Sequence, residues 1–390
     1  MSHEPKMAKK PEWAPRIWQG CNVSAWTRLL IKNRFAVHPS RLYIAVIVTV
    51  MSVTHSVLGW LQTLIYGRAV NATKLAAPPI FILGHWRNGT TLLHELMIQD
   101  PRFAYPTTYQ CVDPNHFLLT ESLFTKLFGF LLPHERPMDH MKAGWDRPQE
   151  DEFALCMLGV PSPYTSIAFP NSPPHDQDYL DLERVPAPAL ARWKQALTRF
   201  LQQITYKTGK RIVLKSPPHT ARIKALKEMF PGALFVHIMR DPYVVFASTV
   251  NLWRTLDEVQ GFQAPNHAGL EERVFETFNL MHARLEEGKR LLPVEQFFEL
   301  RYEDLVQDPV ATLQNVYDHL QLGGWEAMEP RLKEFVATLR GYETNKYQQT
   351  PSQRDEITRR WGDVIQRYGY DRPDEFRTEN PEPAALSHGM

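Results

Sequence analysis

A glycine-bearing stretch in the first quarter of the chain combines residue types that bind phosphate. In "FILGHWRNGTTLLHEL" an apolar run ends at Gly84, and Gly89 follows five residues later, directly before Thr90 and Thr91. A strand, a glycine loop and a helix in this order present backbone N–H groups, hydroxyls and the positive end of a helix dipole to an anion. The spacing is close to that of a P-loop, but Thr90 replaces the lysine, and the nearest cation is Arg87, inside the loop. The sequence therefore predicts a phosphate site without the lysine that γ-phosphoryl transfer uses.

A second stretch, "VHIMRDPYVVFAST", offers a cation and a hydroxyl for another phosphate. Arg240 follows an expected strand, Pro242 suits the first turn of the next helix, and Ser248 lies about two helical turns further on. A guanidinium and a hydroxyl so placed can bind a second phosphate away from the first. Taken alone, the same residues also fit an arginine paired with a carboxylate and an ordinary helix hydroxyl. No strand ending in a metal-binding aspartate is evident, so we expect no metal in this site.

Together the two stretches resemble the PAPS-dependent sulfotransferases, in particular the branch that includes bacterial sulfotransferases and tyrosylprotein sulfotransferases. "WRNGTTLLHEL" is similar to the 5′-phosphosulfate loop of that branch, with Asn88 in place of its serine, and "RDPYVVFAS" is similar to its 3′-phosphate motif. "KSPPH" from Lys215 to His219 and "LRYEDL" from Leu300 match two further family blocks. The resemblance extends over about residues 79–320.

The resemblance implies a metal-independent transfer of a sulfuryl group from PAPS to a hydroxyl or amine acceptor. Fixed cations and oriented N–H groups stabilise the charge that grows on the departing phosphate. Arg87 matches the family cation at the leaving phosphate, and Lys215 matches a lysine near the sulfuryl group. The implied 5′-phosphate cradle consists of Asn88, Gly89, Thr90 and Thr91, and the implied 3′-phosphate clamp consists of Arg240 and Ser248.

The acceptor also needs a base, and four residues are candidates. They are Glu150 and Glu152 in "RPQEDEFALCML", His116 in "DPNHF", and His219. Acidic residues in a first helical turn also simply complement the helix dipole, and His219 also fits a capping or core histidine. We expect Glu152 to be the base, because it shares a helical face with an apolar stripe that ends at a small residue, Gly159.

The elements that must position these residues alternate between strands and helices. Buried strands are expected at "PIFIL", "RIVLK" and "ALFVHIM", and a later strand at "QFFELRYEDL". A long helix ends at Gly209, and further helices are expected at residues 309–320 and 328–339. This order predicts an α/β, P-loop-like three-layer fold with a mostly parallel central sheet flanked by helices.

The first 78 residues differ from the rest and predict a helical N-terminal extension. The segment is basic and aromatic up to Arg41 and then strongly apolar over residues 42–66, with His55 and Gln62 as polar interruptions. It is long enough to span a bilayer, but the interruptions favour membrane association without a clean span, or burial against the domain. We expect residues 79–390 to form the sulfotransferase domain, in which the proline-rich residues 105–186 form a substrate wall or lid.

Composition narrows the functional classes further. The chain has 44 basic and 43 acidic residues among 390, so nothing indicates a nucleic-acid partner. Three distant cysteines form neither a disulfide framework nor a metal spacing. From the family resemblance we expect a sulfotransferase that uses PAPS and an unidentified acceptor, and that is cytoplasmic or membrane-associated. A P-loop-like nucleotide or small-molecule kinase, and a non-catalytic nucleotide- or membrane-binding protein, remain alternatives.

Overall fold

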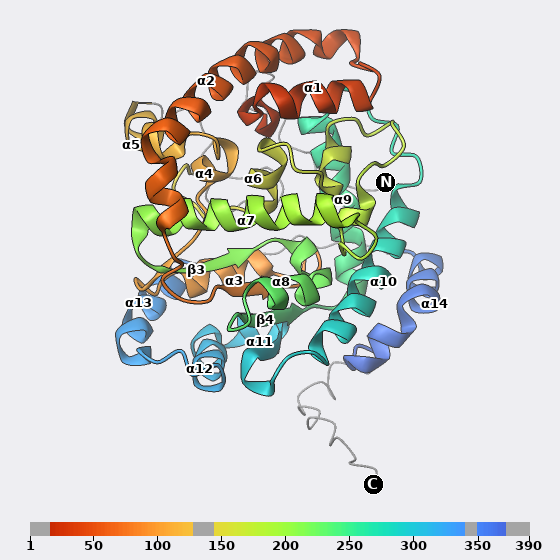
Figure 1. Cartoon of the computed structure of the whole chain (residues 1–390). Helices are drawn as coiled ribbons and strands as arrows, with labels where there is room; N and C mark the ends of the chain where they lie inside the picture. Colours follow the sequence, from red (N-terminus) through yellow and green to blue (C-terminus); the bar gives the residue numbers. More distant parts are fainter. Residues whose placement is uncertain (1–15, 128–143, 340–348, 372–390) are drawn as a thin grey trace.

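The computed structural model describes residues 16–127, 144–339 and 349–371 (Figure 1). Residues 1–15 of the predicted extension, residues 128–143 of the predicted insertion, and residues 340–348 and 372–390 lie outside the described part. The strands are β1 (Ile80–Leu83), β2 (Phe103–Ala104), β3 (Arg211–Lys215), β4 (Leu234–Met239) and β5 (Phe297–Arg301). The α-helices up to α7 are α1 (Val23–Lys32), α2 (Leu42–Ala72), α3 (Thr90–Met97), α4 (Thr108–Val112), α5 (Phe117–Leu127), α6 (Asp151–Met157) and α7 (Ala187–Thr208). The later ones are α8 (Ile223–Met229), α9 (Pro242–Gln260), α10 (Leu270–Lys289), α11 (Tyr302–Gln307), α12 (Pro309–His319), α13 (Trp325–Thr338) and α14 (Pro351–Arg367).

The strands form one parallel sheet in the order β2-β3-β1-β4-β5. The central strand β1 pairs with β3 on one side and with β4 on the other. The carboxyl ends of these three strands therefore open into the same crevice, which is where open α/β sheets bind their ligands. The predicted α/β class with a parallel sheet is confirmed; the short edge strand β2 was not expected.

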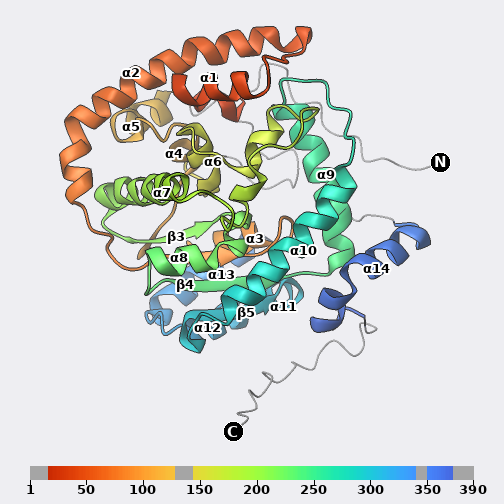
Figure 2. The ribbon, with the colours of Figure 1, turned by 45° about the vertical axis from the view of Figure 1, so that its right-hand side comes forward.

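Helices cover both faces of the sheet and produce three layers (Figures 1 and 2). Alternate residues of β1 point to opposite faces, as a strand requires. Phe81 and Leu83 belong to a core shared with α7, α8 and α10, whereas Ile80 and Ile82 belong to a core shared with α3, α12 and α13. All four side chains are fully buried, so β1 is apolar on both faces. This is the pattern of a central parallel strand.

The N-terminal extension lies outside these layers as the helices α1 and α2 (Figure 2). Helix α2 has a buried face that contains both of its polar interruptions: Ile44, Val48, Ser52, His55, Gln62, Gly67 and Val70. Its opposite face exposes large apolar side chains, among them Val46, Val50, Val53, Val57, Trp60 and Leu64. The helix thus inverts the usual surface pattern, with polar groups toward the protein and apolar groups outward.

Length and composition would allow this helix to cross a membrane. Within the part of the chain that the structure describes, Pro39–Ala72 is the one helical stretch with this property, and 22% of its most apolar window is buried. Gln62 anchors α2 to the α4–α5 connection, because its Nε2 donates to the backbone oxygen of Asn115 (3.0 Å) and its Oε1 accepts from the backbone N–H of Leu118 (2.7 Å). In this arrangement α2 is attached to the domain along one face.

Candidate active site

The loop between β1 and α3 is packed tightly at the carboxyl end of the central strand. Gly84 has φ +150°, and a Cβ there would lie 2.8 Å from the backbone oxygen of Ile238 on β4. Gly89 has φ +94°, and a Cβ there would lie 2.2 Å from the ring of Tyr302. Both positions therefore require glycine. The loop backbone packs directly against β4 and Tyr302, which fixes its position at the strand ends.

The two motifs that the sequence separates by about 150 residues meet at this loop. The Nε of Arg87 donates to the hydroxyl of Ser248 on α9 at 2.8 Å. The guanidinium of Arg240 donates to the backbone oxygen of Arg87 at 3.1 Å and lies 4.2 Å from the ring centre of Tyr302. The structure therefore brings together two cations and a hydroxyl beside the glycine loop. Both arginines are only partly buried, so an anion can reach them.

The first turn of α3 adds backbone donors to these cations. Gly89 is the N-cap of α3, and no side chain caps the helix there. The helix start at Thr90 and Thr91 therefore presents N–H groups and the positive end of the dipole to the crevice. This is the arrangement that binds phosphate in other α/β proteins.

Asn88 takes a different place from the one expected. Its side chain is fully buried, and its Nδ2 donates to the backbone oxygen of Ile238 at 3.0 Å. Its backbone N–H donates to the backbone oxygen of His85 at 3.1 Å. The side chain faces β4 and not the crevice. Asn88 therefore braces the loop against the sheet, and its expected contact with the 5′-phosphate does not fit this geometry.

A hydrogen-bonded chain connects the loop to a carboxylate from the predicted insertion. The indole Nε1 of Trp86 donates to the hydroxyl of Tyr164 at 2.8 Å, and this hydroxyl donates to Oε2 of Glu150 at 2.5 Å. The other oxygen of Glu150 accepts from Nζ of Lys215, at the end of β3, at 2.6 Å. Burial and the neighbouring Glu150 raise the pKa of Tyr164 well above its usual range, so the phenol stays protonated and remains a donor. Glu150 keeps a partly exposed side chain, whereas Lys215 is almost buried.

Glu152 does not fit its expected role as the base. Its carboxylate has no exposed surface and forms a double hydrogen bond with Arg222, at 2.5 and 3.0 Å. The hydroxyl of Ser162 donates to the same carboxylate at 2.5 Å. An acceptor hydroxyl cannot reach a carboxylate that has no exposed surface. Glu152 thus belongs to a buried ion pair between α6 and the loop after β3.

The two candidate histidines are buried as well. His219 is fully buried and its Nε2 lies 2.8 Å from Oδ2 of Asp151. The other oxygen of Asp151, Oδ1, accepts from the hydroxyl of Ser216 at 2.7 Å. Burial alone would raise the pKa of Asp151, but His219 beside it lowers the pKa below the usual value. His116 lies in the α4–α5 connection and contacts His55 of α2. Neither imidazole is placed as a base for the crevice.

Sequence reasoning missed three aromatic residues of this site. Tyr302 stands within the "LRYEDL" stretch, so a signal for its position was present, and its ring closes over Gly89. Trp86 is adjacent to Arg87 in the loop, but nothing in the sequence indicates its bond to Tyr164. Tyr164 lies in a proline-rich segment without periodicity, and only the fold brings it to Glu150.

Residues 78–327 match the sulfotransferase family, which covers more than half of the chain, and the chain belongs to that family. This confirms the family that the two motifs indicated. The match favours a sulfotransferase over the kinase and the non-catalytic binding protein.

Two mycobacterial relatives are similar to this chain over almost its whole length. It is 49% identical over 381 residues to the omega-hydroxy-beta-dihydromenaquinone-9 sulfotransferase Stf3 of Mycobacterium bovis, covering 98% of this chain and 96% of that protein. The Stf3 protein of Mycobacterium tuberculosis shows the same identity and coverage.

Solved structures share the fold at much lower sequence identity. The sulfotransferase STF9 from Mycobacterium avium has a TM-score of 0.65 at 19% identity, covering 89% of this chain and 92% of that one. The sulfotransferase STF1 from Mycobacterium tuberculosis H37Rv has a TM-score of 0.59 at 18% identity, covering 88% and 94%. These likenesses support the α/β architecture described above.

Proposed function

We propose that the sulfuryl donor is PAPS, bound across the β1–α3 loop and the start of α9. The convergence of Arg87, Arg240 and Ser248 beside Gly89 is the observation that carries this proposal. The 5′-phosphosulfate rests on the loop and the uncapped start of α3, at Thr90 and Thr91. The 3′-phosphate is bound by Arg240 and Ser248, which matches the roles that the family resemblance implies. The 5′-phosphosulfate and the 3′-phosphate of PAPS each take one of the two arginines, Arg87 and Arg240.

In this proposal Arg87 and the N–H groups of α3 carry the electrostatic part of catalysis. The acceptor oxygen forms a bond to sulfur while the bond from sulfur to the bridging phosphate oxygen breaks. Negative charge then grows on adenosine 3′,5′-bisphosphate, the leaving group. Donors that are already fixed in position stabilise this charge without reorganising during the reaction. No metal takes part in the transfer as we propose it.

We propose Glu150 as the base that takes the acceptor proton, in place of Glu152. Glu150 is the carboxylate that keeps exposed surface and is tied to the loop through Tyr164 and Trp86. Lys215 holds the carboxylate from the end of β3, in register with Ile82 of the central strand. In the family resemblance the matching lysine lies near the sulfuryl group, so we assign Lys215 to both the carboxylate and the sulfuryl oxygens.

We propose that the acceptor is the terminal hydroxyl of an isoprenoid quinone, a lipid with a long apolar tail. The names of the two curated relatives support this class, because they act on a hydroxylated dihydromenaquinone and match this chain over almost its whole length. A hydroxyl at the end of an apolar tail suits a base that lies among Phe153, Tyr164 and Trp86. We infer that residues 105–186, which supply Glu150 and Tyr164, form the acceptor wall.

A lipid acceptor also gives a function to the exposed apolar face of α2. We propose that this face lies in the membrane interface, while the polar face with His55 and Gln62 stays bound to the domain. The 31 residues of α2 extend about 46 Å, enough to attach the enzyme to a surface from which the acceptor is taken. The enzyme is then membrane-associated without a spanning segment.

A transfer assay tests the proposed donor and acceptor separately. Purified enzyme is incubated with ³⁵S-labelled PAPS and ω-hydroxylated dihydromenaquinone in detergent, and the lipid product is identified by mass spectrometry. The proposal predicts a mass increase of one sulfuryl group and release of adenosine 3′,5′-bisphosphate. Omega-unhydroxylated dihydromenaquinone is the matched control and should give no lipid sulfate. Release of the bisphosphate only with other hydroxyl acceptors would retain the donor and reject the acceptor; no turnover of PAPS with any acceptor would reject the donor.

A further inference from the structure

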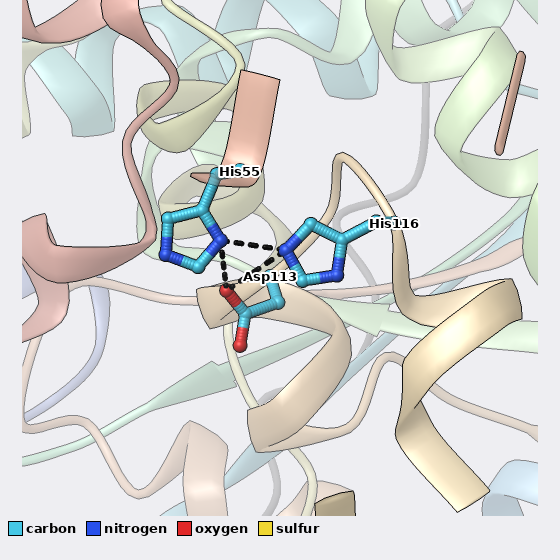
Figure 3. A group of neighbouring side chains, drawn as sticks. All are labelled: His55, Asp113 and His116. Carbon is cyan, nitrogen blue, oxygen red and sulfur yellow. Dashed lines mark hydrogen bonds and ion pairs between the residues drawn. The ribbon is translucent and has the colours of Figure 1, made fainter. Parts of the chain in front are cut away.

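Three side chains outside the proposed active site converge on one buried point between α2 and the α4–α5 connection (Figure 3). His55 comes from α2, Asp113 caps the end of α4, and His116 directly precedes α5; each is less than 8% exposed. The Nδ1 of His55 lies 2.6 Å from Nε2 of His116 and 3.2 Å from Oδ1 of Asp113. The distance from Nε2 of His116 to the same oxygen is 3.6 Å.

The far side of His116 fixes which of its nitrogens carries a lone pair toward this point. Its Nδ1 lies 2.8 Å from the hydroxyl of Thr120. That hydroxyl gives its own proton to the backbone oxygen of His116 and accepts from the hydroxyl of Tyr109. With the proton of Thr120 on the backbone oxygen, Nδ1 donates to Thr120, and a neutral ring then carries a lone pair on Nε2. A histidine whose outer N–H is fixed in this way is typical of a metal ligand.

The carboxylate oxygen at the same point lacks a partner that would explain its burial. Within the described part of the chain, Oδ1 of Asp113 is buried without a hydrogen bond, and it faces Nδ1 of His55 at 3.2 Å and Nε2 of His116 at 3.6 Å. A buried acceptor without a hydrogen bond is destabilising. A cation at the point where the three atoms meet removes this penalty.

We propose that His55, Asp113 and His116 bind one divalent transition-metal ion, with Zn²⁺ as the best match. Two imidazoles and a carboxylate are ligands that Zn²⁺ accepts, and the second oxygen of Asp113 or a water completes four-coordination. Bonds of about 2.0–2.1 Å in a tetrahedron place two ligand nitrogens about 3.3 Å apart, so the two rings separate slightly when the ion binds.

The ion acts as a clamp between the N-terminal extension and the domain. His55 and Gln62 stand seven residues apart on the same face of α2, and both reach the α4–α5 connection. Gln62 forms its attachment with hydrogen bonds, and the ion forms the second attachment at His55. The site is buried and separate from the proposed transfer chemistry, so its role is structural.

Metal content and thermal stability of the full chain, prepared without a polyhistidine tag, test this proposal without an activity assay. The protein is stripped with a chelator, exchanged into metal-free buffer, and equilibrated with Zn²⁺ or Co²⁺ before free metal is removed. We expect one ion per chain by mass spectrometry of the metal, a visible absorption spectrum of four-coordinate Co²⁺, and a Tm raised by several degrees on adding Zn²⁺. Wild-type protein that binds no Co²⁺ with this spectrum would overturn the proposal and leave a proton shared between the two histidines.

Substitutions then assign the ion to these ligands. Asp113→Asn keeps the side-chain shape and His116→Gln keeps a polar group, and we expect each to weaken metal binding at least about tenfold and to remove the Zn²⁺-dependent rise in Tm. His38→Gln, at an exposed histidine outside the cluster, is the matched control and should behave as wild type. Equal binding by the wild type and both cluster variants would place the ion elsewhere and refute the assignment. The Co²⁺ spectrum of the wild type decides the question even if a variant fails to fold.

Discussion

The donor half and the acceptor half of the proposed active site are built in different ways. The donor half consists of two short motifs at the carboxyl ends of β1 and β4, and adjacent parallel strands bring them together directly. The acceptor half joins Trp86 from the loop, Glu150 and Tyr164 from the segment 105–186, and Lys215 from β3. Local sequence is therefore a good guide to the donor half and a poor guide to the acceptor half.

Two glutamates two residues apart make the same point on a smaller scale. Glu150 precedes α6 and keeps a partly exposed carboxylate, whereas Glu152 lies within α6 and is buried against Arg222. Both belong to the acidic stretch Glu150-Asp151-Glu152. The carboxylate that can meet a substrate is therefore decided by burial and by the paired cation, Lys215 or Arg222.

The largest expected effect tests the acceptor half at Glu150. Glu150→Gln keeps the size of the side chain and removes the base, so we expect kcat to fall by about 10²–10⁴-fold. Binding of adenosine 3′,5′-bisphosphate, measured by calorimetry, should be unchanged because the donor half is intact. A kcat within about threefold of wild type would exclude Glu150 as the base, since a positioned base is worth far more.

Glu152→Gln is the matched comparison. We expect it to lower the stability of the fold and to leave the rate of the chemical step unchanged. The change leaves the guanidinium of Arg222 buried beside a neutral amide, which typically costs about 3–5 kcal/mol in the free energy of unfolding. Urea denaturation measures this loss, and kcat per folded molecule should stay near the wild-type value. Normal stability together with lost turnover would reverse the roles that we give to the two glutamates.

Arg87→Ala tests the donor half. The change removes a donor to the leaving phosphate, and we expect turnover to fall by about 10²–10³-fold. Rapid-quench measurement of a single turnover separates this chemical step from product release. Arg254→Ala, at an exposed arginine later on α9, is a suitable control and should leave the rate unchanged. An undiminished chemical step in Arg87→Ala would remove this residue from the transition state.

Arg240→Ala tests whether the donor half holds two phosphates. A charge-assisted contact is worth about 1.5–3 kcal/mol, so the variant should lose roughly 10- to 100-fold in affinity for adenosine 3′,5′-bisphosphate. Its affinity for AMP, which lacks the 3′-phosphate, should hardly change. Calorimetry with both nucleotides measures the difference. Equal affinity of the wild type for the two nucleotides would contradict the 3′-phosphate clamp.

The smallest expected effect concerns the outer face of α2. Val57→Glu places a charge on this face and should lower partitioning into phosphatidylcholine vesicles by up to about tenfold. Val294→Glu changes an even more exposed valine outside α2 (72% against 58% for Val57) and should leave partitioning unchanged. Vesicle flotation measures both variants. If the two variants float alike, α2 is not the membrane contact.

Several elements followed from local patterns alone. The strands β1, β3, β4 and β5 and the helices α7, α12 and α13 lie where apolar runs and periodicity predict them. The strands β1, β3 and β4 bury nearly continuous apolar runs, whereas β5 at the sheet edge buries Leu300 alone. The strand β2 has only two residues, too few for a pattern, and it exists because the edge of β3 is there to pair with it. Helix α14 was not expected, although Ile357, Trp361, Val364 and Ile365 have helical spacing and form one buried face against α9 and α10.

The sequence by itself determined the glycine loop, the arginine–serine motif, the parallel α/β class and the unusual apolar segment near the N-terminus. Each of these depends on residues that are close along the chain, so composition and spacing are enough to express it. Tertiary structure alone decided that Asn88 faces the sheet, that Glu152 is buried against Arg222, and that His55 meets Asp113 and His116. These outcomes depend on contacts across tens of residues or more, and the physical reason is that burial and partner choice are properties of the packed whole.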